Sequence, residues 1–96
     1  MMESRDAYTA RAKAQLDHWN AEMDRWQVKS QDLSAEARKR YEEQMGAALK
    51  HRDQAAAKLA EMQAIAGEAW VGMRQGVDDA WGSLRDSLNK VKSTLS

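Results

Sequence analysis

Apolar residues recur at steps of three and four along most of this chain, and no proline interrupts them. Such steps place residues on one face of an α-helix, so the pattern predicts helices that bury a shared seam against one another. We therefore expect an all-α protein of the coiled-coil or helical-bundle class. The seam consists of Leu16, Trp19, Met23, Trp26, Tyr41, Met45, Ala48, Leu59 and Met62.

Length and charge narrow the class of protein further. The chain has 96 residues, which predicts a single small domain over residues 1–96. Its 15 basic and 15 acidic residues are well mixed, and no third of the chain has a net charge beyond one. Since nucleic-acid binding requires a basic face to neutralise phosphates, we expect no nucleic-acid partner.

Cysteine and long apolar runs are both missing from the sequence. Without cysteine there is no disulfide and no thiolate ligand. No segment approaches the roughly 18 apolar residues of a membrane-spanning helix, and the first residues do not resemble a secretory signal. We expect a soluble, cytoplasmic protein.

Residues 30–34 form the weakest helical stretch, because serine and aspartate side chains compete for backbone hydrogen bonds. Ser34 is a candidate N-cap for a following helix, with Glu36 in its first turn. These residues predict a helix over about 4–29, a turn at 30–34 and an antiparallel helical hairpin. The alternative is one uninterrupted helix, since the three-four frame continues through Ser30 and Leu33 to Ala37.

Gly67 is the second candidate break in the chain. A glycine can end a helix in the left-handed conformation, but no other turn-forming residue accompanies this one. We therefore expect one long second helix over about 35–95, with a bend at Gly67. The alternative is an up-down-up three-helix bundle.

The last third of the chain contains an eleven-residue repeat, in which residues 68–78 align with residues 79–89. The repeat produces an apolar stripe with a flank of small residues, and a first helix of about 26 residues is too short to cover it. We expect this face to join two copies, as a homodimer, or to bind another protein. The face consists of Trp70, Met73, Val77, Trp81, Leu84, Leu88, Val91 and Leu95, with Ala69, Gly76 and Ala80 on its flank.

Catalytic and metal-binding patterns are not visible. His18 and His51 are interpreted as exposed surface residues rather than members of a histidine or glutamate–histidine metal site. The sequence contains no nucleophile–base arrangement and no glycine-rich phosphate loop. Arg52 lies on the seam and is expected to pair with an acid on the first helix or to fix the register. We expect no enzyme activity and no cofactor.

The segments RYEEQM (40–45), KHRDQAAAKL (50–59), GEAWVGM (67–73) and GVDDAW (76–81) follow one another along the chain. Together they resemble small bacterial coiled-coil proteins that are associated with stress responses or have no characterised role. The resemblance covers roughly residues 16–90 and implies a bacterial origin and a non-catalytic role.

Taken together, the patterns predict a non-enzymatic coiled-coil assembly protein that self-associates through its C-terminal amphipathic helix. The alternative is a peripheral protein that places this helix on a lipid surface or protects other proteins. Interfacial tryptophans and flanking basic residues suit a lipid boundary, whereas the stripe of small residues favours packing against a helix.

Overall fold

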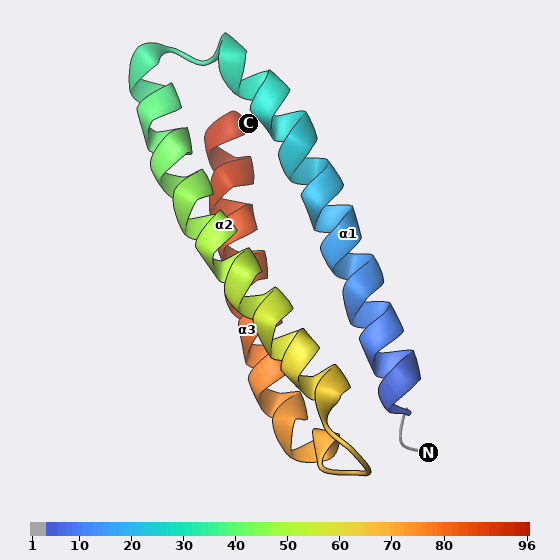
Figure 1. Cartoon of the computed structure of the whole chain (residues 1–96). Coiled ribbons are helices and arrows are strands. Elements are labelled where there is room, and N and C mark those ends of the chain that lie inside the picture. The colour runs from blue at the N-terminus through green and yellow to red at the C-terminus, as the bar shows by residue number, and fades with distance from the viewer. Residues whose placement is uncertain (1–3) are drawn as a thin grey trace.

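The computed structural model describes residues 4–96, and residues 1–3 of the predicted domain lie outside it. Three helices follow one another: α1 (Arg5–Lys29), α2 (Ala35–Ala64) and α3 (Trp70–Leu95), with a short 3₁₀ turn η1 (Ser30–Asp32) after α1. They run up, down and up in a bundle of 51 × 20 × 17 Å (Figure 1). The prediction of an all-α protein is confirmed.

Serine side chains set the starts of the first two helices. The Ser4 Oγ accepts a hydrogen bond from the Ala7 N–H at 3.1 Å, and the Ser34 Oγ accepts one from the Ala37 N–H at 3.2 Å. Each hydroxyl satisfies one of the amides that a helix N-terminus leaves without an intrahelical partner. The chain therefore reverses within residues 30–34, where the Ser/Asp cluster predicted a turn.

The expected continuous second helix is not formed. α2 ends at Ala64, and Gly67 adopts φ +66°, the left-handed conformation that glycine reaches without steric cost. A second reversal follows, and α3 begins at Trp70 (Figure 1). Gly67 reverses the chain although no other turn-forming residue accompanies it. The reversal is favourable because burying the apolar face of α3 within the chain offsets the free-energy cost of the turn. The chain thus adopts the alternative, the three-helix bundle.

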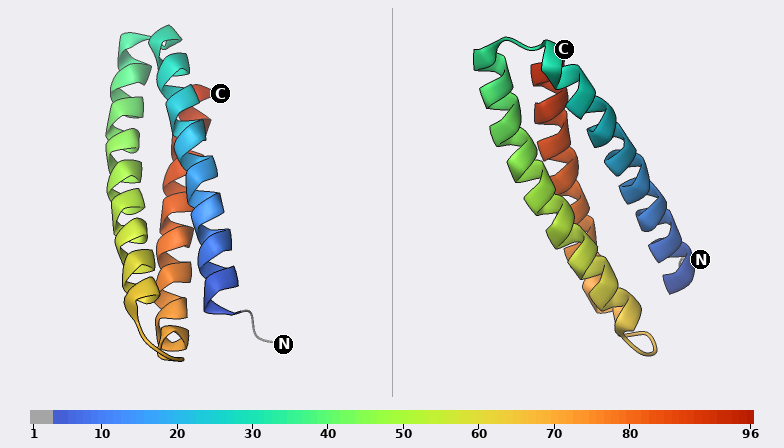
Figure 2. Two further views of the ribbon diagram at one scale, coloured as in Figure 1. Left: turned by 45° about the vertical axis from the view of Figure 1, so that its right-hand side comes forward. Right: turned by 45° about the horizontal axis from the view of Figure 1, so that its top comes forward.

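The core consists of two apolar clusters, one toward each end of the bundle, and α2 and α3 form the most extensive helix pair. Two views in Figure 2 show the three helices side by side along the long axis. The cluster near the 30–34 turn is built from Met23, Trp26, Tyr41, Met45, Ala48, Ala55, Leu84, Leu88 and Val91. The cluster near the Gly67 turn is built from Tyr8, Leu59, Met62, Trp70 and Val77.

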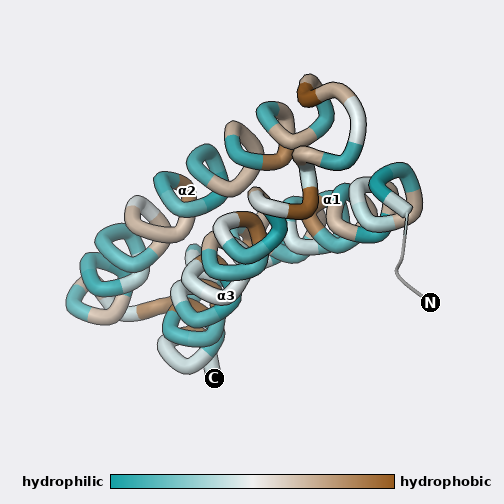
Figure 3. Tube along the Cα trace, turned by 90° about the horizontal axis from the view of Figure 1, so that it is seen from below, coloured by the Kyte–Doolittle hydropathy of each residue, from teal (hydrophilic) through white to brown (hydrophobic). Residues whose placement is uncertain are grey.

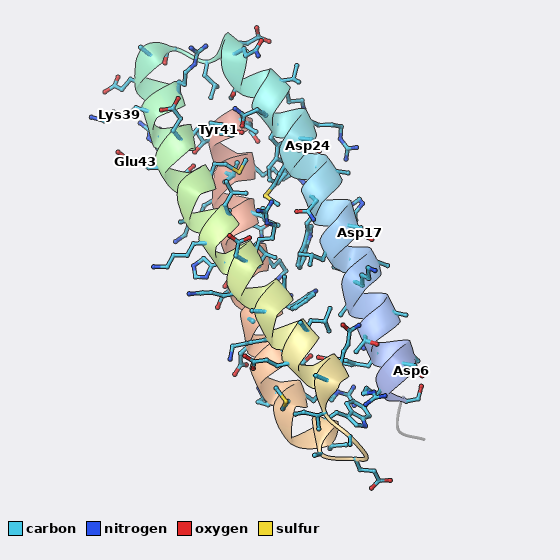
Figure 4. All side chains as sticks on the ribbon, viewed as in Figure 1. Asp6, Asp17, Asp24, Lys39, Tyr41 and Glu43 are labelled. Carbon is cyan, nitrogen blue, oxygen red and sulfur yellow. The ribbon has the colours of Figure 1, made fainter. Side chains whose placement is uncertain are left out.

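Hydrophilic residues occur along all three helices (Figure 3), and most of them are exposed. In Figure 4, Asp17 on α1 and Lys39 and Glu43 on α2 lie on the outer surface, and Tyr41 lies between the helices. Within the described residues, the exposed large apolar side chains are Val28 and Val71. The closed bundle therefore presents no broad apolar patch to solvent.

Candidate interaction site between α1 and α3

The predicted seam lies inside the bundle, but unevenly. Its α2 members are buried, and so are Met23 and Trp26 near the end of α1. Leu16 and Trp19, in the middle of α1, are only partly buried against the same cluster. Trp19 is therefore less buried than Trp26, although both side chains pack against this cluster.

The face predicted to join two copies is covered within the chain. Five of its residues are buried, namely Trp70, Val77, Leu84, Leu88 and Val91. Five others are partly buried, namely Met73, Trp81, Leu95, Gly76 and Ala80, whereas Ala69 is exposed. The argument that half of this face must lie bare on a long helix is wrong, because the reversal at Gly67 returns α3 to α1 and α2.

Near the Gly67 turn, Tyr8 joins α1 to α3. Its side chain is 3% exposed, and its hydroxyl donates a hydrogen bond to the Asp78 Oδ1 at 2.5 Å. The ring lies 6.0 Å from the Trp70 ring, and the guanidinium carbons of Arg11 and Arg74 lie 5.5 and 5.1 Å from its centroid. Burial raises the pKa of the Tyr8 phenol well above its usual value, and the hydrogen bond to Asp78 raises this pKa further.

At the same end of the bundle, the start of α1 also contacts the α2–α3 connection. The Arg5 Nη1 donates a hydrogen bond to the carbonyl oxygen of Ile65 at 2.5 Å. Ile65 is the C-cap residue directly after α2, so its carbonyl has no following helical amide to bind. Arg5 therefore supplies a donor to this helix end from sixty residues away.

At the opposite end, aromatic residues join α1 to α2. Trp26 is 8% exposed and belongs to the same cluster as Tyr41. The Tyr41 hydroxyl donates a hydrogen bond to the Gln27 Oε1 at 3.1 Å, and burial raises the pKa of Tyr41. α1 is thus held at both ends by a buried aromatic side chain together with a hydrogen bond.

Between these two ends, no residue from 10 to 22 is buried. Over part of this stretch a groove of about 350 Å³ separates α1 from α3. Among its lining residues are Tyr8, Trp19, Asp78, Trp81 and Arg85. The buried Nε1 of Trp81 has no hydrogen-bond partner within residues 4–96. The middle of α1 therefore covers α3 without the close packing of a finished core.

Arg52 makes a different contact from the one expected. It donates to the Asp53 Oδ1 of its own helix at 3.1 Å and, at 3.5 Å, to the Asn20 Oδ1 of α1. The partner on the first helix is thus a neutral amide rather than an acid. A long hydrogen bond to an amide adds little to the attachment of α1.

His18, interpreted from the sequence as an exposed surface residue, is exposed and pairs with Glu22. Its Nε2 lies 2.9 Å from the Glu22 Oε1, one helical turn later. Within the described part of the chain, no three His, Cys, Asp or Glu residues are grouped so that they could hold a metal ion. A two-residue surface pair of this kind stabilises a helix modestly.

Sequence reasoning missed the Tyr8–Asp78 contact. In the sequence, Asp78 is only the last residue of the first eleven-residue repeat, directly after the stripe residue Val77. Nothing in the periodicity of α3 distinguishes Asp78 from Asp79, yet Asp78 faces α1 whereas Asp79 lies beside residues of α2. Recognising the second reversal at Gly67 would have brought α3 to α1 and drawn attention to this pair.

None of the helices within residues 4–96 is both long and apolar enough to cross a membrane. Comparison with known proteins adds no identity, since no protein-family model, no curated protein and no solved structure matches this chain.

Proposed function

We propose that this chain is a non-enzymatic assembly protein that associates with further copies of itself through the apolar face of α3. The observation that carries the proposal is the uneven attachment of α1, which has no buried residue from 10 to 22. Residues 4–96 of the closed bundle expose no broad apolar patch, so a partner reaches the apolar face of α3 only where α1 gives way. Of the three helices, α1 packs least extensively against the other two.

Two measurements on the full chain test this proposal. Its mass should rise with concentration from low micromolar upward in sedimentation equilibrium. A fluorescent peptide of residues 4–34 should bind the full chain by replacing its own α1. The matched control is the same peptide with Tyr8, Met23 and Trp26 replaced by alanine, which should not bind.

The mass of a single chain at every concentration would contradict self-association. Binding of the labelled peptide in that case would still show that α1 can be displaced, and it would point to a helix of another protein as the partner. Failure of both measurements would remove the proposed function altogether.

A lipid surface is the second candidate, because α3 has the most one-sided apolar distribution of the three helices. Binding would also require α1 to leave, since the apolar side chains of α3 face the bundle interior. Vesicles of phosphatidylglycerol should then shift the tryptophan emission to shorter wavelength, whereas phosphatidylcholine vesicles should not. We favour the protein partner, because the closed chain already offers α3 a helical cover.

The resemblance to bacterial stress-associated proteins adds a cellular prediction. A role in the bacterial cytoplasm under stress would be tested by comparing the abundance of the chain before and after heat or osmotic shock. An unchanged abundance under both would contradict the stress-associated role and leave the assembly proposal untouched.

A further inference from the structure

The turn between α1 and α2 departs from helical geometry at very few residues. Lys29 and Ser30 are right-handed helical, and the 3₁₀ turn continues α1 to Asp32. Only Leu33, with ψ 151°, and Ser34, with ψ 162°, are extended. No glycine or proline occurs from residue 26 to residue 45. Rotating the backbone at these two positions would join α1 and α2 into one helix.

The other turn differs in this respect. Gly67 has a positive φ, which commits the chain to a reversal that a helix cannot absorb without changing both dihedral angles. The two turns also lie at opposite ends of the bundle (Figure 1). Straightening the first turn would therefore release α1 and leave the α2–α3 hairpin in place.

The apolar frame of the sequence continues through the first turn. Trp26, Ser30, Leu33, Ala37 and Tyr41 follow one another at steps of three and four, so they would share one face of a straightened helix. A closed hairpin does not need this continuity, because each of its helices could set its own frame. Two straightened helices that pack against each other along their whole length do need it.

We infer that two copies exchange α1 by straightening residues 33–34, and this inference rests on the proposed self-association. In the dimer, α1 and α2 of each copy form one helix of about 90 Å. A twofold axis at residues 33–34 makes the two long helices antiparallel. α1 of each copy then lies antiparallel to α2 and parallel to α3 of the other copy, as it does within the closed chain. The contacts of Tyr8 and Trp26 are re-formed between chains.

The balance between the closed chain and the exchanged dimer is then set at the turn. Straightening loses the Ser34 N-cap and the hydrogen bond from the Arg38 Nη2 to the Gln31 carbonyl at 2.7 Å. It adds helical backbone hydrogen bonds across residues 30–38 and frees the Gln31 carbonyl to accept one of them. Substitutions at the turn should therefore change the dimer dissociation constant, whereas substitutions in the α1–α3 contact should change mainly the rate of exchange.

Ala35→Pro tests the inference in one direction. Ala35 is the first residue of α2 and follows an extended Ser34, which is the setting that proline accepts without strain. In a straightened helix the same proline would remove the hydrogen bond to Gln31 and clash with its carbonyl. The variant should keep the helicity of the closed bundle while its dimer weakens by roughly ten-thousandfold, because the dimer contains two straightened helices and therefore two such prolines. Ala35→Gly is the matched control, because it keeps the N–H and should dimerise much more tightly than Ala35→Pro.

Cysteine cross-linking tests the exchange without relying on that variant. The natural chain has no cysteine, and Gln15 of α1 and Arg85 of α3 line the same groove. A mixture of Gln15→Cys and Arg85→Cys chains should form a disulfide-linked pair of the two different chains under oxidation. Lys13→Cys, on the exposed side of α1, should not form one with Arg85→Cys.

Dimers of unchanged affinity in Ala35→Pro, or no preference for the Gln15–Arg85 pair over the Lys13–Arg85 pair, would overturn the exchange of α1. Self-association as such would survive that result. Absence of any dimer in the natural chain would instead contradict the proposed function on which the exchange depends.

Discussion

At the scale of single residues, Tyr8 makes several kinds of contact where α1 meets α3. It combines a buried ring, a hydrogen bond to Asp78 and two guanidinium groups over its ring. Its phenol is neutral in the bundle because burial disfavours the phenolate. The contact is therefore sensitive both to removal of the hydroxyl and to high pH.

We expect Tyr8→Phe to lower the free energy of unfolding by about 1 kcal/mol at neutral pH, since it removes one partly buried hydrogen bond and keeps the ring. Urea denaturation followed by circular dichroism measures this change. A variant as stable as the natural chain would mean that water replaces the Tyr8–Asp78 contact without loss.

The raised pKa of Tyr8 adds a pH dependence. Above about pH 10 the unfolded chain releases its phenolic proton while the folded chain still holds it, so the folded state binds more protons and rising pH favours unfolding. The free energy of unfolding should therefore fall above about pH 10. In Tyr8→Phe this fall should be shallower, and identical pH profiles would contradict the role of Tyr8.

The two tryptophans of α1 should contribute differently to the free energy of unfolding. Trp26→Ala should cost about 3–5 kcal/mol, because it empties a buried site. Trp19→Ala should cost only about 1–2 kcal/mol, because its half-buried ring borders the groove. Urea denaturation of both variants measures the difference, and equal losses would indicate that the middle of α1 packs as tightly as its end.

At the scale of the elements, the two turns have different physical causes. The first reverses through extended residues that any side chain tolerates, and the second through a glycine with positive φ. A matched pair of glycine-to-alanine substitutions distinguishes the effect of backbone conformation on stability from the effect of the space available for a side chain. A β-carbon at Gly67 or at Gly72 would meet no atom within 4 Å beyond the adjoining residues and the backbone of its own helix.

Gly67→Ala should lower the free energy of unfolding by about 1 kcal/mol or more, because alanine resists the left-handed conformation. Gly72→Ala should instead raise the free energy of unfolding by up to about 1 kcal/mol, because Gly72 lies inside α3. Thermal unfolding of both variants provides the comparison. A stabilising Gly67→Ala would imply that α2 and α3 fuse, as the sequence alone suggested.

At the scale of the whole molecule, the bundle consists of a tight pair and a looser third helix. α2 and α3 share the larger part of both apolar clusters, and the Thr94 Oγ1 donates to the Gln44 Oε1 at 2.6 Å near the open end of the pair. α1 contributes the ends of the clusters and leaves its middle half-covered.

Hydrogen exchange should reveal this hierarchy. Backbone amides from 10 to 22 should exchange through local openings well below the free energy of global unfolding, whereas the amides around Leu84 and Leu88 should exchange only on global unfolding. Mass spectrometry of peptides from native protein would measure both. Equal protection of α1 and α3 would contradict the displaceable α1 on which the proposed function rests.

Local chemistry was sufficient to predict the helical class, the first helix and the first turn. Proline-free three-four spacing, the Ser34 cap and the Ser/Asp cluster all act within a few residues, so their outcome is readable along the chain. The stripe residues of α3 were likewise recognisable as a face that must be buried. In each case the cause and the effect lie within one or two helical turns.

Only the tertiary structure decided which helices cover the apolar stripe of α3. A single glycine is tolerated within a helix at a cost of about 1 kcal/mol, so Gly67 alone favours neither a bend nor a reversal. The reversal wins because α3 then buries Val77, Leu84 and Val91 against α1 and α2, a gain from contacts tens of residues away. The Tyr8–Asp78 bond and the half-buried Trp19 follow from how three helices meet, which no periodicity along one helix contains.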